Sequence, residues 1–253
     1  MKYRTNPGEM FKHEREERVS AYPNNKALMD AKTVFMREST RPKYSYNFSW
    51  LGRSIIQYPQ DIVAMQEIIW SVKPDLIIET GIAHGGSLIL SASLITILEA
   101  CEEIENGRVL GIDIDIRSYN REAILAHPMS KKITMYEGSS TDKEMIGKVY
   151  KFAEKASKLL VCLDSNHTHE HVLAELNAYA PLVSGGSYCV VFDTVIEDMP
   201  DDMFSDRPWG EGNNPKTAVR EYLKTHPEFE ADKLIENKLL ITAAPGGYLK
   251  RVR

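Results

Sequence analysis

The chain has 253 residues, of which 43% are hydrophobic, and its 31 basic and 36 acidic residues give a net charge of −5 at pH 7. This length can bury one sizeable core, and the lack of a basic block argues against a nucleic-acid partner. No run approaches the roughly 18 apolar residues of a membrane span, and the N-terminus has no signal-peptide pattern, so we expect a cytoplasmic protein.

Residues 1–55 differ in composition from the rest of the chain. A charged segment at 12–18 is followed by an aromatic, extended segment at 41–50. Neither has the pattern of a buried core, so we predict an N-terminal arm that serves packing, dimerisation or as an active-site lid. Such an arm favours a homo-oligomer. A helix is predicted next, with Asp61 as its N-cap and its apolar periodicity running to Trp70.

Short apolar runs alternate with helical patterns from residue 73 onward. We predict strands at 75–79, 108–113, 133–136, 159–164 and 187–193. Helices are predicted near 87–105, 118–126, 142–157 and 169–182. A last strand is predicted at 238–243, before a glycine-bearing turn that would close a terminal hairpin. This alternation is typical of an α/β domain with a doubly wound, mostly parallel sheet, which we place at residues 56–253.

The first predicted strand leads into a glycine-bearing loop, residues 79–87. Ligands of such sheets bind beyond the carboxyl ends of the strands, where glycines let the backbone approach closely. The spacing Gly81-x-x-x-Gly85-Gly86 departs from the dinucleotide pattern. The leading acid, Glu79, suits an amino-acid-like cofactor better than a pyrophosphate. On spacing alone, a glycine turn with a purely structural role remains open.

Acidic and hydroxyl side chains follow the next two strands. Asp113 is placed to accept both ribose hydroxyls of a nucleoside, whereas Asp115 fits an ordinary loop charge. Ser139 is placed to border an adenine, although it also fits a helix cap. These positions extend the predicted binding site beyond the glycine loop.

The fourth and fifth strands both end in carboxylates, Asp164 and Asp193. Parallel neighbours bring their carboxyl ends to the same edge of the sheet. Mg²⁺ takes oxygen ligands and retains several waters, so these two carboxylates and the hydroxyl of Thr194 predict a magnesium site.

Three histidines alternate along the loop after the fourth strand: His167, His169 and His171. A zinc or iron site is one interpretation, which ranks below magnesium because alternate residues at a loop-to-helix junction point in different directions. His167 lies three residues past Asp164, and neutral imidazole can accept the proton of a substrate hydroxyl. A solvated or capping histidine is the other interpretation for each.

A long insertion separates the fifth strand from the next helix. It comprises an acidic segment, 197–203, and a segment rich in glycine and asparagine, 207–215. Insertions above the strand ends usually serve the substrate. Trp209 either stacks on a substrate ring or packs the loop.

Several of these segments together resemble the family that contains cephalosporin hydroxylase and rhamnosyl O-methyltransferase. The segments that carry the resemblance are 46–52, 79–87, 113–117, 137–140, 163–169 and 208–215. The similarity spans roughly residues 40–250 and is far more specific than a lone glycine loop. It implies a Rossmann-like class I methyltransferase fold with a seven-stranded sheet, S-adenosylmethionine as cofactor and, in several members, Mg²⁺.

The resemblance also implies roles for individual residues. It places cofactor contacts at Glu79, Gly81, His84, Gly85, Ser87, Asp113, Ser139 and Asp164. The site is similar to that of catechol O-methyltransferase, in which carboxylates at the ends of the fourth and fifth strands hold Mg²⁺ and a base follows the first of them. Asp164 and Asp193 match these ligands, and His167 matches the base, so His167 and Asp164 are the predicted catalytic residues. Thr194 stands where related sites have an acidic or amide side chain.

The resemblance therefore implies an S-adenosylmethionine-dependent O-methyltransferase, assisted by Mg²⁺, that acts on a hydroxyl of a sugar or a glycosylated natural product. A small molecule or glycan is the expected acceptor. Two alternatives remain open: the hydroxylase component of cephalosporin 7α-methoxylation, and a non-catalytic subunit that binds S-adenosylmethionine.

Overall fold

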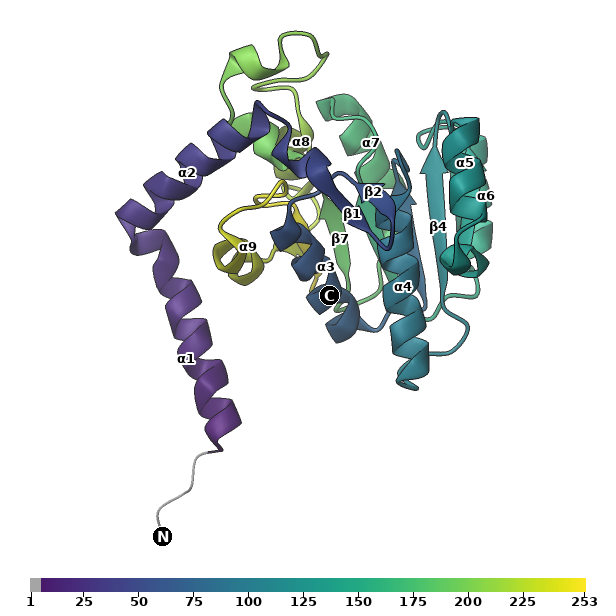
Figure 1. The fold of residues 1–253 in the computed structure, drawn as a ribbon, viewed down its shortest axis with the longest axis horizontal. Helices are drawn as coiled ribbons and strands as arrows, with labels where there is room; N and C mark the ends of the chain where they lie inside the picture. Colours follow the sequence, from purple (N-terminus) through teal and green to yellow (C-terminus); the bar gives the residue numbers. More distant parts are fainter. Residues whose placement is uncertain (1–5) are drawn as a thin grey trace.

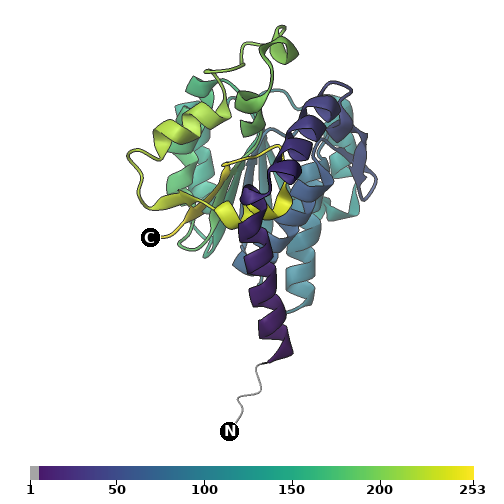
Figure 2. The ribbon, with the colours of Figure 1, turned by 90° about the vertical axis from the view of Figure 1, so that its left-hand side faces the viewer.

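Two helices precede the sheet in the computed structural model, which describes residues 6–253. Helix α1 (Pro7–Ala21) extends away from the body of the molecule, and α2 (Lys26–Thr40) leads back to it (Figures 1 and 2). Each begins at an asparagine, Asn6 or Asn25, whose side chain accepts a hydrogen bond from a backbone N–H of the first turn. The predicted arm is thus helical.

The aromatic segment at 41–50 is not extended throughout, in contrast to the prediction. It contains the 3-10 helix η2 (Tyr44–Asn47) and the strand β1 (Phe48–Trp50). Strand β1 pairs antiparallel with β2 (Arg53–Ile55) in a separate hairpin. This hairpin connects the arm to the main domain.

Within residues 6–253, seven strands form the central sheet. They are β3 (Leu76–Thr80), β4 (Arg108–Asp113), β5 (Ile133–Glu137), β6 (Leu159–Leu163), β7 (Tyr188–Val191), β8 (Phe229–Ala231) and β9 (Tyr248–Arg251). The spatial order is β5-β4-β3-β6-β7-β9-β8, with β9 antiparallel to both its neighbours and the pairs from β5 through β7 parallel. This confirms the predicted doubly wound, mostly parallel sheet. The strand order reverses between β3 and β6, where such sheets bind ligands.

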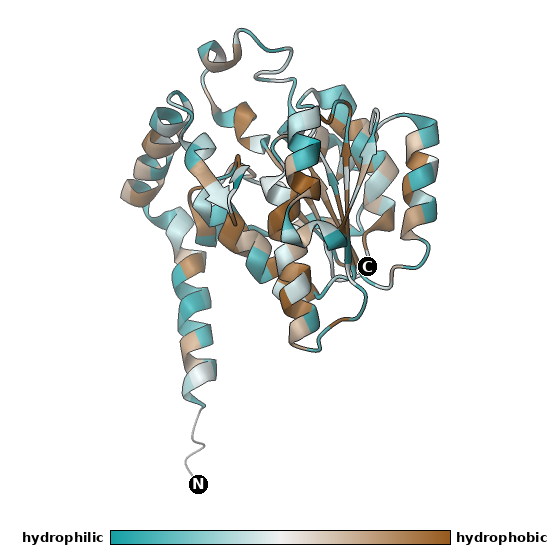
Figure 3. Ribbon diagram, turned by 45° about the vertical axis from the view of Figure 1, so that its right-hand side comes forward, coloured by the Kyte–Doolittle hydropathy of each residue, from teal (hydrophilic) through white to brown (hydrophobic). Residues whose placement is uncertain are grey.

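Helices cover both faces of the sheet. The helices are α3 (Pro59–Val72), α4 (Gly86–Ala100) and α5 (Ser118–Leu125) on one face, and α6 (Lys143–Ala153), α7 (His169–Tyr179) and α8 (Pro215–Tyr222) on the other. Along β3, Ile77 packs toward the first face, whereas Leu76 and Ile78 pack toward the second. Such alternation with both faces buried explains the continuous apolar runs, which Figure 3 shows in brown. Among the described residues, no helix is both long and apolar enough to cross a membrane.

The C-terminal region differs from the prediction. Residues 238–243 fit a strand by composition, but α9 (Lys233–Leu239) ends within this run and a loop follows. Ala243 and Ala244 are buried in that loop, so burial rather than β-structure accounts for the apolar run. Strand β9 pairs with β8 instead of closing a hairpin through the adjacent glycine turn.

Asp61 ties this C-terminal loop to α3. The predicted N-cap is wrong, because α3 starts at Pro59 and its N-cap is Tyr58. The Asp61 carboxylate is fully buried and accepts hydrogen bonds from the Thr242 hydroxyl, from the Ala243 N–H at 2.8 Å and from the Tyr248 hydroxyl at 2.7 Å.

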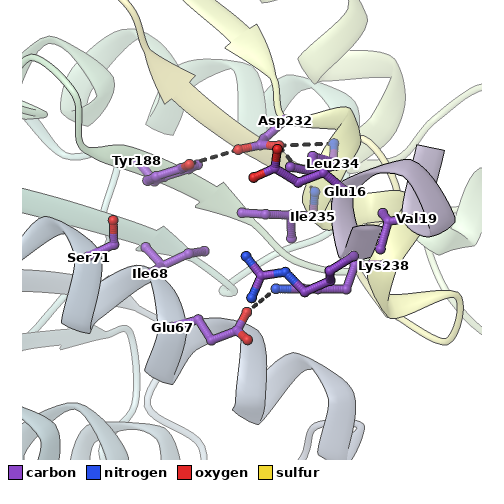
Figure 4. A pocket seen from close by; sticks show the side chains of 11 residues that line it. Glu16, Val19, Glu67, Ile68, Ser71, Tyr188, Asp232, Leu234, Ile235 and Lys238 are labelled. Atoms are coloured by element: carbon purple, nitrogen blue, oxygen red, sulfur yellow. Dashed lines mark hydrogen bonds and ion pairs between the residues drawn. The ribbon is translucent and has the colours of Figure 1, made fainter. Parts of the chain in front are cut away.

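The arm meets the main domain over a cavity of about 170 Å³ (Figure 4). Val19 of α1 is buried there beside Ile235 of α9. In Figure 4 the Tyr188 hydroxyl donates to Asp232 at 2.8 Å. Tyr188 begins β7, so this cavity lies beside the amino end of β7, away from the predicted site at its carboxyl end.

Candidate active site

A larger cavity, of about 620 Å³, lies at the carboxyl ends of β3, β6 and β7. It is lined by parts of the glycine loop, by arm and linker residues between 40 and 58, by the loop after β6, by Asp193 and by parts of the insertion between 195 and 209. The arm and the insertion therefore enclose the same space as the predicted catalytic residues.

The glycine loop packs too tightly for any side chain at two positions. A Cβ atom on Gly81 would lie 1.9 Å from the backbone oxygen of Asp164, and one on Gly86 would lie 2.2 Å from that of Ser54. Gly81 and Gly85 also have φ angles of 87° and 82°, in the left-handed region. The loop thus packs directly against the end of β6 and against the hairpin.

Glu79 lies buried beneath this loop. Its carboxylate accepts a hydrogen bond from the Ser87 hydroxyl. Burial, together with the nearby charges of Asp164 and Asp113, raises the pKa of Glu79 to about 8. A bound cation would favour the ionised form of this carboxyl group.

Asp113 fastens the glycine loop from the end of β4. One carboxylate oxygen accepts from the Ile82 N–H at 2.7 Å and the Ala83 N–H at 3.3 Å, and the other accepts from the Asp115 N–H at 3.2 Å. Ser139 follows β5, where its hydroxyl lies 3.1 Å from that of Thr141. Of the predicted cofactor contacts, Gly81, His84, Ser87 and Asp164 line the cavity. Glu79, Gly85, Asp113 and Ser139 lie outside that lining.

Two residues hold the loop in a way that the sequence did not indicate. Arg53 of the hairpin donates to the His84 carbonyl oxygen, at 3.1 Å from Nε, and to the Asn120 side chain, at 3.1 Å. Asn120 in turn donates to the Ala83 carbonyl oxygen at 2.9 Å. No motif marks them, because their role depends on the tertiary position of the hairpin and of α5.

The structure brings three predicted residues together: Asp164, His167 and Asp193. His167 Nε2 lies 3.6 Å from Asp164 Oδ1, and His167 Nδ1 lies 3.2 Å from Asp193 Oδ2. One possible ligand atom from each residue lies within 4.8 Å of the others, close enough to surround one metal ion. Asp193 has a φ of 55°, so the chain turns sharply directly after β7.

The charges of Asp164, His167 and Asp193 shift the pKa values of Asp164 and His167. Burial, with the neighbouring charge of Asp193, raises the pKa of Asp164 to about 7, although the His167 hydrogen bond opposes this shift. Burial lowers the pKa of His167, but the attraction of Asp193 and Asp164 outweighs it, so the net shift is upward. The group therefore favours binding a proton or a cation.

Thr194 does not join this group. Its side chain is fully buried and its hydroxyl donates to the Pro245 carbonyl oxygen at 3.0 Å. It lies outside the cavity lining. The predicted third metal ligand is therefore corrected: Thr194 ties the start of η5 (Thr194–Asp198) to the C-terminal loop.

The other two histidines bond elsewhere. His169 Nδ1 lies 2.8 Å from the Thr217 hydroxyl, which ties α7 to α8. His171 Nε2 lies 3.1 Å from the hydroxyls of both Ser140 and Ser165. Among the described residues, only His167 of the three histidines belongs to a group of possible metal ligands.

Trp209 lies next to the group of Asp164, His167 and Asp193. Its ring centroid is 4.8 Å from that of His167, and the Arg207 guanidinium lies 5.6 Å from the Trp209 ring. Arg41 donates to Asp202 at 3.0 Å, so the arm and the insertion touch each other. The Trp209 ring and this contact between arm and insertion both border the cavity.

The strand order and the strand-end site define a class I methyltransferase. This order, with its single antiparallel strand β9, places a glycine loop after the first strand of the sheet and carboxylates after the second, fourth and fifth. Residues 42–252 match the family model described as Rhamnosyl O-methyltransferase/CmcI. The chain belongs to that family.

Individual relatives agree with this assignment. The chain is 29% identical to a rhamnosyl O-methyltransferase of Mycobacterium tuberculosis (strain ATCC 25618 / H37Rv) over 208 residues, which cover 80% of this chain and 78% of the relative. It is 28% identical to that of Mycobacterium leprae (strain TN), covering 80% and 82%. Among solved structures, a CmcI described as Mg-SAM is 20% identical, with a TM-score of 0.56 over 82% of this chain and 78% of that one. An O-methyltransferase from Bacillus cereus in complex with SAH is 14% identical, with a TM-score of 0.51 over 82% and 83%.

Proposed function

We propose that the protein transfers the methyl group of S-adenosylmethionine to a hydroxyl of a sugar, in a reaction assisted by Mg²⁺. The observation that carries this proposal is the Asp164–His167–Asp193 group, which faces the same cavity as the glycine loop. The names of the mycobacterial relatives, rhamnosyl O-methyltransferases, support a sugar acceptor, and a rhamnosyl group in particular.

The residues present fit S-adenosylmethionine. Gly81, His84 and Ser87 of the glycine loop line the cavity, so a ligand can lie against the loop. The buried Glu79 and the nearby carboxylates of Asp113 and Asp164 suit the cationic sulfonium and ammonium groups of this cofactor. Asp113 at the end of β4 would receive the ribose, and Ser139 after β5 the adenine.

The donor set also fits Mg²⁺, which Asp164 and Asp193 would hold. Mg²⁺ commonly takes one or two carboxylates and completes its shell with waters and substrate oxygens. When bound, the cofactor supplies a methyl group activated by a positive sulfur, and the ion lowers the pKa of the acceptor hydroxyl.

His167 acts as the general base in this proposal. It accepts the hydroxyl proton on a ring nitrogen as the acceptor oxygen forms its bond to the methyl carbon and the carbon–sulfur bond breaks. Asp193 and Asp164 stabilise the resulting imidazolium, because both carboxylates lie beside the ring. Positioned base catalysis of this kind typically contributes about 10²–10⁴-fold to the rate.

The arm and the insertion are proposed to enclose the acceptor. Trp209 offers an apolar ring face beside His167, on which a sugar can pack. The Arg41–Asp202 pair joins α2 to the insertion above the cavity, and Met36 of α2 is buried against Val195. This arrangement suits the predicted lid role of the arm, which excludes water from the transfer.

A release assay tests the proposal. Purified protein is incubated with S-adenosylmethionine and a panel of rhamnosides and nucleotide sugars, and S-adenosylhomocysteine release is measured with Mg²⁺ or with EDTA. We expect acceptor-dependent release that EDTA suppresses. Product formation that requires O₂ and a reductant would favour the hydroxylase alternative instead.

A further inference from the structure

Asp61 is a fully buried acidic residue that the mechanism above does not use. A carboxylate that leaves water must be compensated by hydrogen bonds, and three groups within residues 6–253 donate to this one. The Thr242 hydroxyl and the Ala243 N–H belong to the C-terminal loop, residues 240–247, between α9 and β9. The third donor is the Tyr248 hydroxyl of β9. The buried carboxylate therefore holds the C-terminal loop against α3.

The C-terminal loop also accepts hydrogen bonds from the chain on both sides of Asp193. The donors are the N–H groups of Val191 and Val195 and the hydroxyl of Thr194, and their acceptors are the carbonyl oxygens of Gly247, Ala243 and Pro245, at 2.8, 3.1 and 3.0 Å respectively. A Cβ atom on Gly247 would lie 2.0 Å from the Val191 backbone oxygen, so the loop lies directly against the end of β7. The loop thus contacts the chain immediately before and after Asp193.

The backbone conformation of Asp193 depends on such support. Its φ of 55° lies in the left-handed region, which residues other than glycine rarely adopt unless their surroundings hold them there. In this conformation the Asp193 carboxylate lies 3.2 Å from His167 Nδ1, in the wall of the large cavity. A shift of the C-terminal loop would therefore move this carboxylate relative to Asp164, the other proposed metal ligand.

We propose that Asp61 is a positioning residue, which anchors the C-terminal loop and thereby fixes the Asp193 carboxylate for a divalent cation. This proposal rests on the proposed function. The affinity of a metal site depends on the groups that orient its ligands as well as on the ligands themselves. Asp61 does not line the cavity, so it acts through Ala243 and Val195 and not on the ion directly.

Binding of Mn²⁺, measured by paramagnetic resonance, tests this role with two substitutions that both remove the charge of Asp61. Asp61→Leu also removes the acceptor of the Ala243 N–H. In Asp61→Asn the amide oxygen can still accept that bond, while the amide nitrogen donates to the two neighbouring hydroxyls, which can rotate. We expect Asp61→Leu to weaken Mn²⁺ binding by about 10–100-fold. Asp61→Asn should keep most of the affinity, and equal losses in both variants would assign the effect to charge and overturn the positioning role.

Tyr248→Phe is the matched control. It removes one donor from the same buried carboxylate but leaves both of its bonds to the C-terminal loop. Mn²⁺ affinity should therefore stay at the wild-type level, with all titrations made well below the melting temperature of the least stable variant. Wild-type affinity in Asp61→Leu, or an equal loss in Tyr248→Phe, would overturn the proposal. If Asp61→Leu does not fold, Thr242→Val breaks the other bond to the loop, and unchanged affinity there would also overturn it.

Hydrogen exchange tests the same role without any metal. Peptides that cover residues 191–196 and 242–247 should exchange faster in Asp61→Leu than in the wild-type protein, because the Val191 and Val195 N–H groups lose fixed acceptors. Exchange in β3 should not change. Unchanged exchange at 191–196 would overturn the proposal. Failure of the wild-type protein to bind Mn²⁺ would instead count against the metal site of the proposed function.

Discussion

Gly81 and Asp164 lie so close that a single methyl group cannot fit between them. A Cβ atom on Gly81 would lie 1.9 Å from the Asp164 backbone oxygen and 2.5 Å from its carbonyl carbon. This approach occurs where β3 and β6 end side by side, at the reversal of the strand order. The glycine loop and the strand end that carries Asp164 are therefore one packed unit.

Gly81→Ala should disrupt the packing of the glycine loop against the strand end at Asp164. The new side chain would clash with backbone, and alanine at a φ of 87° is strained in any case. We expect a loss of at least about 2 kcal/mol in the free energy of unfolding and much weaker S-adenosylhomocysteine binding. Denaturant unfolding and calorimetry measure both. Gly185→Ala is the control, since nothing lies within 4 Å of a Cβ atom there; equal effects of the two substitutions would contradict the account.

His167→Gln should lower turnover by about 10²–10⁴-fold, because the base is lost. Glutamine still fills much of the space beside Trp209, so S-adenosylhomocysteine should bind with nearly the wild-type affinity. Turnover and calorimetry on the same preparation separate the two effects. A variant with wild-type turnover would remove His167 from the mechanism.

Asp164→Asn and Asp193→Asn should abolish stimulation by Mg²⁺. Each removes a charged ligand from the group that lies within 4.8 Å. We expect turnover to fall about 100-fold or more, equivalent to several kcal/mol of lost stabilisation. Paramagnetic resonance of Mn²⁺, used as a probe ion, reports binding directly. Glu170→Gln, an exposed neighbour on α7, serves as the control and should bind Mn²⁺ normally.

Glu79 should make the ligand-free protein less stable as the pH rises. Its pKa is about 8 in the folded protein against 4.5 for a free side chain. Between these values the folded state keeps a proton that the unfolded state releases, so stability falls with increasing pH. From pH 5 to pH 8 this amounts to about 3 kcal/mol. Glu79→Gln should flatten the slope by that amount in denaturant titrations at the two pH values; an unchanged slope would show that Glu79 is ionised throughout.

The sheet could be predicted from the sequence because its strands are buried on both faces. Runs such as Leu76–Thr80 and Leu159–Leu163 are short, mostly apolar and buried at every position. Short runs of this kind are typical of parallel strands that lie between two layers of helices. The run 238–243 follows the same rule of composition but forms no strand. A buried loop and a buried strand have similar residues, and here the Asp61 carboxylate accepts from the Ala243 N–H of the loop.

The sequence predicted the position of those polar residues that directly follow a strand. Asp164, His167 and Asp193 lie together because neighbouring parallel strands end at one edge. Thr194 was misplaced because a positive φ at Asp193 turns the chain and buries the next residue. Arg53 reaches the glycine loop from a separate hairpin, and no local pattern shows where such a hairpin docks.

The most direct test of the central claim is calorimetric titration of the wild-type protein with S-adenosylhomocysteine in the presence of Mg²⁺. The glycine loop, the buried Glu79 and the carboxylates at the strand ends predict one site per chain, with a dissociation constant well below about 1 mM. No binding heat up to about 1 mM ligand, which corresponds to about 4 kcal/mol of binding free energy, would contradict it.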